Sequence, residues 1–151
     1  MLRLLQGDVG SGKTIVAVFS LIQAVENDFQ TAVMAPTEIL ARQHLQNFTE
    51  YLNPLSIQIA FLSGSQNTQE RREQLELIES GKAKVIIGTH ALFQDSVSFK
   101  DLSLVIIDEQ HKFGVHQRLS LSQKANKTPH QLVMTATPIP RSLTMSAYAD
   151  L

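Results

Sequence analysis

The 151-residue sequence predicts a three-layer α/β fold, in which helices cover both faces of a mainly parallel β-sheet. Two observations predict this fold. Short apolar runs alternate along the chain with longer segments of helical periodicity, which is the pattern of strands joined by crossover helices. Most of the runs are continuously apolar, as expected of parallel strands that are buried on both faces. The length is that of about one domain.

The first predicted strand, at residues 2–5, leads into a glycine-rich loop and then into an apolar helix that we expect to end near Glu26. Apolar residues recur along this helix at the i, i+3, i+4 and i+7 positions of a single face. We expect that face to pack on the core. Its members are Ile15, Val16, Val18, Phe19 and Ile22.

Five more apolar runs are predicted strands, at residues 31–34, 57–62, 85–87, 104–107 and 132–134. After the first of them, Pro36 ends the strand and Thr37 is placed to cap a helix. Four residues are expected on the inward face of that helix: Ala41, Leu45, Phe48 and Leu52.

A further helix, between residues 67 and 81, has signals at both ends. Asn67 followed three residues later by Glu70 resembles a capping pair, and Gly81 is placed to end the helix. Leu75 and Ile78 are expected to face inward.

The loop after the first strand fits G-x-x-x-x-G-K-[ST], the pattern of a loop that cradles nucleotide phosphates. Its glycines can take backbone angles that are closed to other residues, so successive N–H groups can turn toward one anion. The loop ends where a helix begins, and the unpaired N–H groups there favour phosphate. We therefore expect nucleotide binding by Gly7, Asp8, Val9, Gly10, Ser11, Gly12, Lys13 and Thr14.

Four side chains are predicted to carry the phosphate chemistry. Lys13 supplies a positive charge for the β- and γ-phosphates, and the Thr14 hydroxyl is placed to ligate Mg²⁺. Asp108 and Glu109 follow a buried strand, where the acidic partner of such a loop is expected. Asp108 would hold Mg²⁺ together with Thr14, and Glu109 would orient and deprotonate the attacking water. An acidic pair that follows a strand more often lies in a solvated turn. The phosphate loop in the same chain favours a catalytic role for this pair.

Composition and charge set outer limits on function. Hydrophobic residues make up 43% of the chain and charged residues 18%, which is typical of a soluble globular protein. No apolar run approaches the length of a membrane span, so no membrane partner is expected. The absence of cysteine excludes disulfides and suits a cytoplasmic location. The net charge of −1 is no sign of a nucleic-acid partner, although backbone amides and hydroxyls can also hold phosphates.

Two further motifs resemble those of superfamily 2 helicases and translocases. Asp108-Glu109-Gln110-His111 resembles their D-E-x-H box, and Thr135-Ala136-Thr137 resembles their S-A-T motif. The resemblance implies a RecA-like P-loop NTPase domain that uses ATP and Mg²⁺, with Lys13, Asp108, Glu109 and His111 as catalytic residues. It also implies that hydrolysis is coupled to movement on DNA through Gln110, His111, Thr135 and Thr137. The structural alternative for His111 is a histidine that is only hydrogen-bonded in a loop. The alternative for Thr135 and Thr137 is that they are only β-branched residues at the end of a strand.

The same resemblance implies contacts with DNA at the ends of the predicted strands. Ala35-Pro36-Thr37 and Gly88-Thr89-His90 occupy the places of the superfamily's DNA-contact motifs. N–H groups and hydroxyls at strand ends and helix starts can meet backbone phosphates. The candidate DNA contacts are Thr37, Gly64, Thr89 and Arg141, and each of them could equally be only a cap.

Within this superfamily the chain is most similar to the RecG family. The similarity covers essentially all 151 residues, and the motifs that carry it are Gly7 to Thr14, Met34-Ala35-Pro36-Thr37-Glu38, Gly88 to Gln94, Ile107 to Arg118 and Met134 to Arg141. Lys112, where the family usually has arginine, and Ser142, where it usually has threonine, keep the charge and the hydroxyl. The family implies action on duplex and branched DNA, including stalled forks and Holliday junctions.

The RecG resemblance also implies partners outside this sequence. The family has an N-terminal wedge domain that engages the junction, and a second RecA-like domain whose arginines complete the ATP site. Neither is recognisable in residues 1–151, so we expect the chain to be the first motor domain, excised from a longer protein.

Three other interpretations were weighed. A transcription-repair coupling factor shares several of the motifs, but Gln110 and Ser11 favour RecG. A guanine-reading switch is suggested by Asn126-Lys127-Thr128-Pro129, yet Pro129 stands where an N-K-x-D motif requires aspartate. A catalytically silent phosphate-loop scaffold is disfavoured because Lys13, Asp108 and Glu109 are intact.

Overall fold

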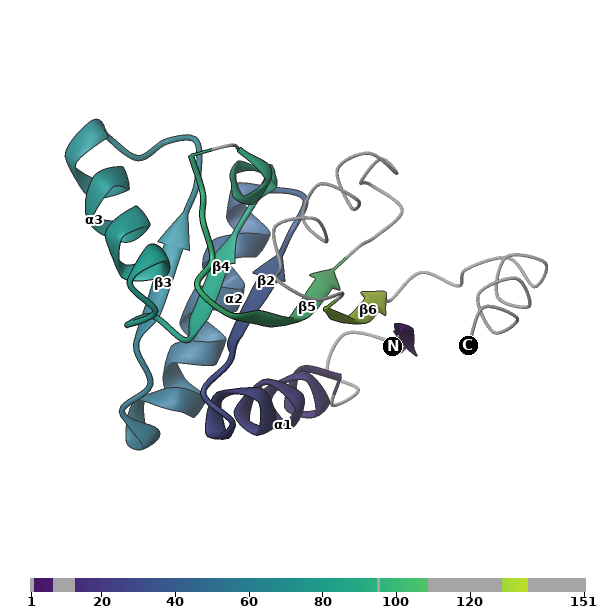
Figure 1. The fold of residues 1–151 in the computed structure, drawn as a ribbon. Coiled ribbons are helices and arrows are strands. Elements are labelled where there is room, and N and C mark those ends of the chain that lie inside the picture. The colour runs from purple at the N-terminus through teal and green to yellow at the C-terminus, as the bar shows by residue number, and fades with distance from the viewer. Residues whose placement is uncertain (1, 7–12, 95, 109–128, 136–151) are drawn as a thin grey trace.

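The computed structural model describes residues 2–6, 13–94, 96–108 and 129–135 (Figure 1). The helices are α1 (Lys13–Glu26), α2 (Glu38–Leu52) and α3 (Thr68–Glu79), with short 3-10 turns η1 (Asn53–Leu55) and η2 (His90–Phe93). The strands are β1 (Leu2–Gln6), β2 (Gln30–Met34), β3 (Ile59–Leu62), β4 (Val85–Gly88), β5 (Leu102–Asp108) and β6 (His130–Thr135). Each strand and helix predicted within these residues is therefore present.

The described strands form one sheet in the order β1-β6-β5-β2-β4-β3. Each neighbouring pair is parallel, which confirms the parallel sheet that the continuous apolar runs predict. Because all the strands point the same way, their carboxyl ends meet along one edge of the sheet. The segments that follow the strands are brought together there.

Alternate residues of the strands face two separate hydrophobic cores. On one face, residues such as Met34, Leu62 and Ile107 pack with Ile78 of α3. On the other face, Val33, Ile87 and Ile106 belong to a cluster that contains residues of α1 and α2. The domain consequently has three layers, with α3 on one side of the sheet and α1 and α2 on the other (Figure 1).

The predicted capping residues stand at the helix ends. The Leu40 N–H donates to Thr37 Oγ1 at 3.2 Å at the start of α2, and the Glu70 N–H donates to Asn67 Oδ1 at 2.8 Å at the start of α3. Each bond satisfies an N–H group that has no partner within its helix. Gly81 follows the last turn of α3 with a φ of +79°, a left-handed conformation that favours glycine.

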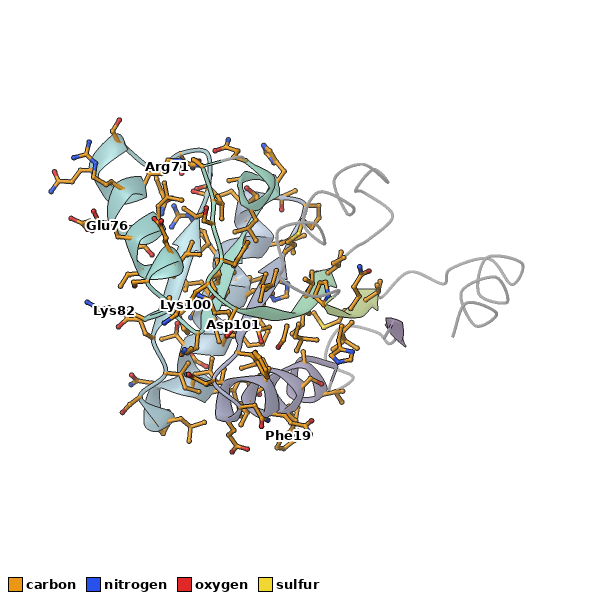
Figure 2. All side chains as sticks on the ribbon, in the orientation of Figure 1. Phe19, Arg71, Glu76, Lys82, Lys100 and Asp101 are labelled. Atoms are coloured by element: carbon orange, nitrogen blue, oxygen red, sulfur yellow. The ribbon has the colours of Figure 1, made fainter. Side chains whose placement is uncertain are left out.

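The spacing predicts the buried face of α1 only in part, since Val18 and Ile22 pack on the core as expected. Ala17, Val18 and Leu21 pack into the core, whereas Ile15 and Val16 are each 45% exposed and Phe19 is 68% exposed. Figure 2 shows Phe19 on the side of α1 that faces away from the sheet. The helix is apolar on more than one face, so periodicity alone could not select the face that the sheet covers.

Gly88 ends β4 at a point where two strands approach closely. A Cβ atom built on Gly88 would lie 2.5 Å from the carbonyl oxygen of Leu62 and 3.1 Å from Cγ of Leu92. The first of these contacts is with backbone, which cannot rotate away as a side chain can. Only glycine therefore fits at the end of β4 with β3 in its present register.

A buried glutamine ties β2 to two segments that are distant in sequence. Gln30 is 0% exposed, and its Nε2 donates to the carbonyl oxygens of Ile78 and Ala83, each at 2.9 Å. Its Oε1 accepts from the Asp101 N–H at 2.9 Å. The side chain thereby joins β2 to the last turn of α3, to the turn that follows it and to the segment that enters β5, where Asp101 is labelled in Figure 2.

Replacing Gln30 by leucine is expected to destabilise the domain by about 2–4 kcal/mol, because it leaves buried backbone groups without their partner. Urea unfolding, monitored by circular dichroism, measures the change in the free energy of unfolding. Gln46→Leu, on an exposed position of α2, is the matched control, and we expect it to change the unfolding free energy by at most about 0.5 kcal/mol. Equal effects of the two substitutions would contradict a structural role of the Gln30 hydrogen bonds.

Candidate nucleotide site at the carboxyl edge of the sheet

The strand register brings the ends of β1, β6 and β5 together at the carboxyl edge. Gln6 pairs with Thr135, and Asp108 pairs with Met134 on the other side of β6. Adjacent strands lie about 4.8 Å apart, so the backbones of Gln6 and Asp108 are separated by about 10 Å. The predicted phosphate loop follows Gln6 directly in sequence, and α1 begins at Lys13. The loop and the acidic pair are thus connected to neighbouring parts of one edge.

Several predicted site residues lie outside the described part of the chain. These are Gly7, Asp8, Val9, Gly10, Ser11, Gly12, Glu109, Gln110, His111, Thr137 and Arg141. For Lys13, Thr14 and Thr135 the backbone is described, within α1 and β6, but the side chains are not. The roles assigned to all of these residues remain predictions.

Asp108 is the acidic residue of the predicted site that the structure describes in full. It ends β5 and is 7% exposed. Its Oδ2 accepts a hydrogen bond from Nε2 of His44 on α2, with 2.7 Å between the two atoms. The two side chains are 9% and 12% exposed, so this contact is largely screened from solvent.

His44 was not among the predicted site residues, although the sequence carries a signal for it. It lies three residues after Ala41 and four before Phe48, on the face of α2 that was expected to be apolar. A polar residue on an inward face needs a buried partner. The sequence could not identify that partner, because Asp108 is 64 positions away.

A second cluster at the same edge joins the segments that follow β2 and β3. Glu38 Oε1 accepts hydrogen bonds from Ser63 Oγ at 3.0 Å and from Arg42 Nη2 at 3.0 Å, and it also accepts one from Ser65 Oγ. The bonds from Ser65, Ser63 and Arg42 hold the pKa of Glu38 below its ordinary value. A lowered pKa means that this cluster supports the fold at neutral pH and loses that contribution as the pH falls through the lowered value.

Three candidate DNA contacts can be placed at this edge. Thr37 is exposed at the start of α2, and Gly64 is exposed with no atom within 4 Å of a Cβ built on it. Thr89 is different: it is 4% exposed, and its Oγ1 accepts from the Ala91 N–H at 3.4 Å as the cap of η2. Thr37 and Gly64 are therefore accessible to a large ligand, whereas Thr89 is buried, and the hydroxyls of both threonines accept capping hydrogen bonds.

The residues at the edge fit a magnesium ion that is shared with a nucleotide. Asp108 supplies the hard carboxylate oxygen that Mg²⁺ prefers. The described residues contain no cluster of three or more acidic or histidine side chains that could hold a metal alone. Magnesium at phosphate-transfer sites is usually held by one or two carboxylates together with phosphates and water. Asp108, at the sheet edge where β1 also ends, supplies one such carboxylate.

A family model described as DEAD/DEAH box helicase matches residues 3–146. The chain belongs to the DEAD/DEAH box helicase family. In the part of the chain that the structure describes, no helix combines the length and apolar character needed to cross a membrane.

Within the helicase family the similarity to RecG is extensive. The chain is 56% identical over its whole length to the ATP-dependent DNA helicases RecG of Haemophilus influenzae and of Escherichia coli K12. A solved structure of RecG bound to a three-way DNA junction aligns with 99% of the chain at a TM-score of 0.81 and 46% identity. These matches confirm the resemblance to RecG that the motifs indicate, and the RecA-like fold that the resemblance implies.

The chain spans 22% of the length of these two helicase relatives and 20% of the chain in the junction complex. The relatives therefore contain extensive sequence beyond the matched segment.

Proposed function

We propose that this chain is the first RecA-like motor domain of a cytoplasmic DNA helicase or translocase that couples ATP hydrolysis to the remodelling of branched DNA. The observation that carries the proposal is the 56% identity to RecG helicases over the whole chain. It is supported by the position of Asp108 at the sheet edge that also receives the end of β1.

In the proposed mechanism, the N–H groups of residues 7–12 and the Lys13 ammonium bind the ATP phosphates. Thr14 and Asp108 would hold Mg²⁺, Asp108 through a water molecule. Bound magnesium neutralises charge that develops on the phosphates. Glu109 would orient the attacking water and accept its proton as the water oxygen bonds to the γ-phosphorus and the bond from that phosphorus to ADP breaks.

Coupling and DNA binding are assigned to the other predicted site residues. Gln110, His111, Thr135 and Thr137 would transmit the state of the nucleotide site to the DNA. Thr37, Gly64, Thr89 and Arg141 would meet backbone phosphates; of the three that the structure describes, Thr37 and Gly64 are exposed and Thr89 is 4% exposed. A second RecA-like domain and an N-terminal wedge domain are the proposed partners in a longer chain.

The proposal is tested by a chimera in which these 151 residues replace the matching segment of the Haemophilus influenzae RecG helicase. We expect a three-way DNA junction to stimulate ATP hydrolysis by the chimera several-fold, and GTP to be a poorer substrate. The unmodified relative serves as the positive control in the same phosphate-release assay. A folded chimera that hydrolyses ATP without any response to DNA would contradict the motor function. No hydrolysis at all would favour a silent scaffold.

A further inference from the structure

The histidine that contacts Asp108 has an arrangement that stability alone does not explain. Nδ1 of His44 is buried and has no hydrogen-bond partner among the described residues. A buried polar atom without a partner costs free energy, so an apolar residue would fill this position of α2 at lower cost. The ring stacks on Phe48 with 5.8 Å between the centroids and 25° between the planes. A phenylalanine could make that contact as well.

Among the contacts that the described residues make with His44, the one that a phenylalanine could not make is the hydrogen bond from Nε2 to Asp108. A carboxylate at the end of a strand can rotate about its side-chain bonds, and a donor fixed to one oxygen restricts that rotation. Because Nε2 lies 2.7 Å from Oδ2, the bond selects one orientation of the carboxylate. The stacking on Phe48 in turn holds the donor, since it restrains the ring of His44.

We propose that His44 is a positioning residue for the magnesium site: by binding Oδ2 it fixes the carboxylate of Asp108 so that the other oxygen is presented to magnesium-bound water. This assignment rests on the proposed function, in which Asp108 holds Mg²⁺. Partners of this kind, which orient a metal-binding group without touching the metal, typically contribute 10–100-fold to metal affinity or activity. His44 thus extends the site to α2.

Three substitutions separate positioning from a merely structural role. His44→Gln keeps an amide N–H donor that can reach Asp108, whereas His44→Asn carries the same group on a shorter side chain that falls short of it. His44→Phe removes the donor but preserves a ring that can stack on Phe48. If either His44→Asn or His44→Phe fails to fold, the other still provides a variant without this hydrogen bond.

The decisive measurement is the affinity of the 151-residue chain for N-methylanthraniloyl-ATP, taken by fluorescence with magnesium and again with EDTA. The dissociation constant in EDTA, divided by the dissociation constant with magnesium, gives a ratio that reports how much magnesium strengthens nucleotide binding. We expect His44→Asn and His44→Phe to lower this ratio by about tenfold or more without changing the affinity in EDTA. His44→Gln is expected to keep the ratio within about threefold of the wild type.

Thermal unfolding without nucleotide provides the second measurement, because a merely structural histidine would alter the melting temperature alone. A wild-type magnesium ratio in His44→Asn and His44→Phe would overturn the assignment of His44 and leave the proposed function intact. A raised ratio would overturn it too, since it would mean that His44 competes with the ion. A wild-type chain that binds the nucleotide equally well with and without magnesium would overturn the proposed magnesium site, and the positioning role with it.

Discussion

The isolated 151-residue chain is expected to hydrolyse ATP about 10³–10⁵-fold more slowly than the same residues placed in a chain with a second motor domain. The reason is that charge develops on the transferred phosphate, and an arginine supplied across the cleft stabilises it. The proposed arginines belong to the second RecA-like domain. We also expect the isolated chain to bind ATP weakly, because it would supply one side of the cleft.

This difference is measured as kcat at saturating ATP and junction DNA, for the isolated chain and for the chimera with Haemophilus influenzae RecG. Circular dichroism of the isolated chain establishes that it is folded under the assay conditions. Brisk, DNA-stimulated turnover by the folded 151 residues would show that the nucleotide site is complete without a second domain.

Glu109→Gln in the chimera is expected to lower kcat by about 10²–10⁴-fold while ATP binding is retained. Glutamine has nearly the shape of glutamate and can still hydrogen-bond to water, but it cannot accept the proton of the attacking water. The expected signature is therefore a loss of turnover at a nearly unchanged dissociation constant for ATP. Single-turnover phosphate release and nucleotide binding, measured on the same preparation, separate the two quantities.

Lys13→Ala is the matched variant for Glu109→Gln, because it removes a phosphate-binding charge and is expected to weaken ATP binding itself. The pair distinguishes a defect in binding from one in chemistry. Unchanged turnover of Glu109→Gln would remove Glu109 from the catalytic assignment and point to another base at this edge of the sheet.

Local signals in the sequence predicted most of the secondary structure. The caps at Thr37 and Asn67 and the helix end at Gly81 depend on residues within a few positions of one another, so they can be recognised without a fold. The strands were recognisable because burial on both faces requires continuous apolar runs. The bounds differ by a residue or two, as for β3, which begins at Ile59 rather than at residue 57.

Contacts between distant residues were not predictable in the same way. On α1 the apolar residues do not all face the core, and the exposure of Phe19 depends on which side the sheet covers. The pairing of His44 with Asp108 and the bonds of Gln30 to Ile78, Ala83 and Asp101 join segments dozens of positions apart. Polarity on a buried face indicates that some partner exists, but it does not name that partner.

The sequence by itself determined the elements, the parallel sheet, the helicase family and the residues expected to bind nucleotide, because these depend on side-chain types at short spacing. Only the tertiary structure decided the strand order, the buried face of α1 and the contact of α2 with the carboxylate of Asp108. The physical reason is that burial and hydrogen bonding across the sheet depend on which strands become neighbours. Which strands become neighbours is decided only when the whole domain packs.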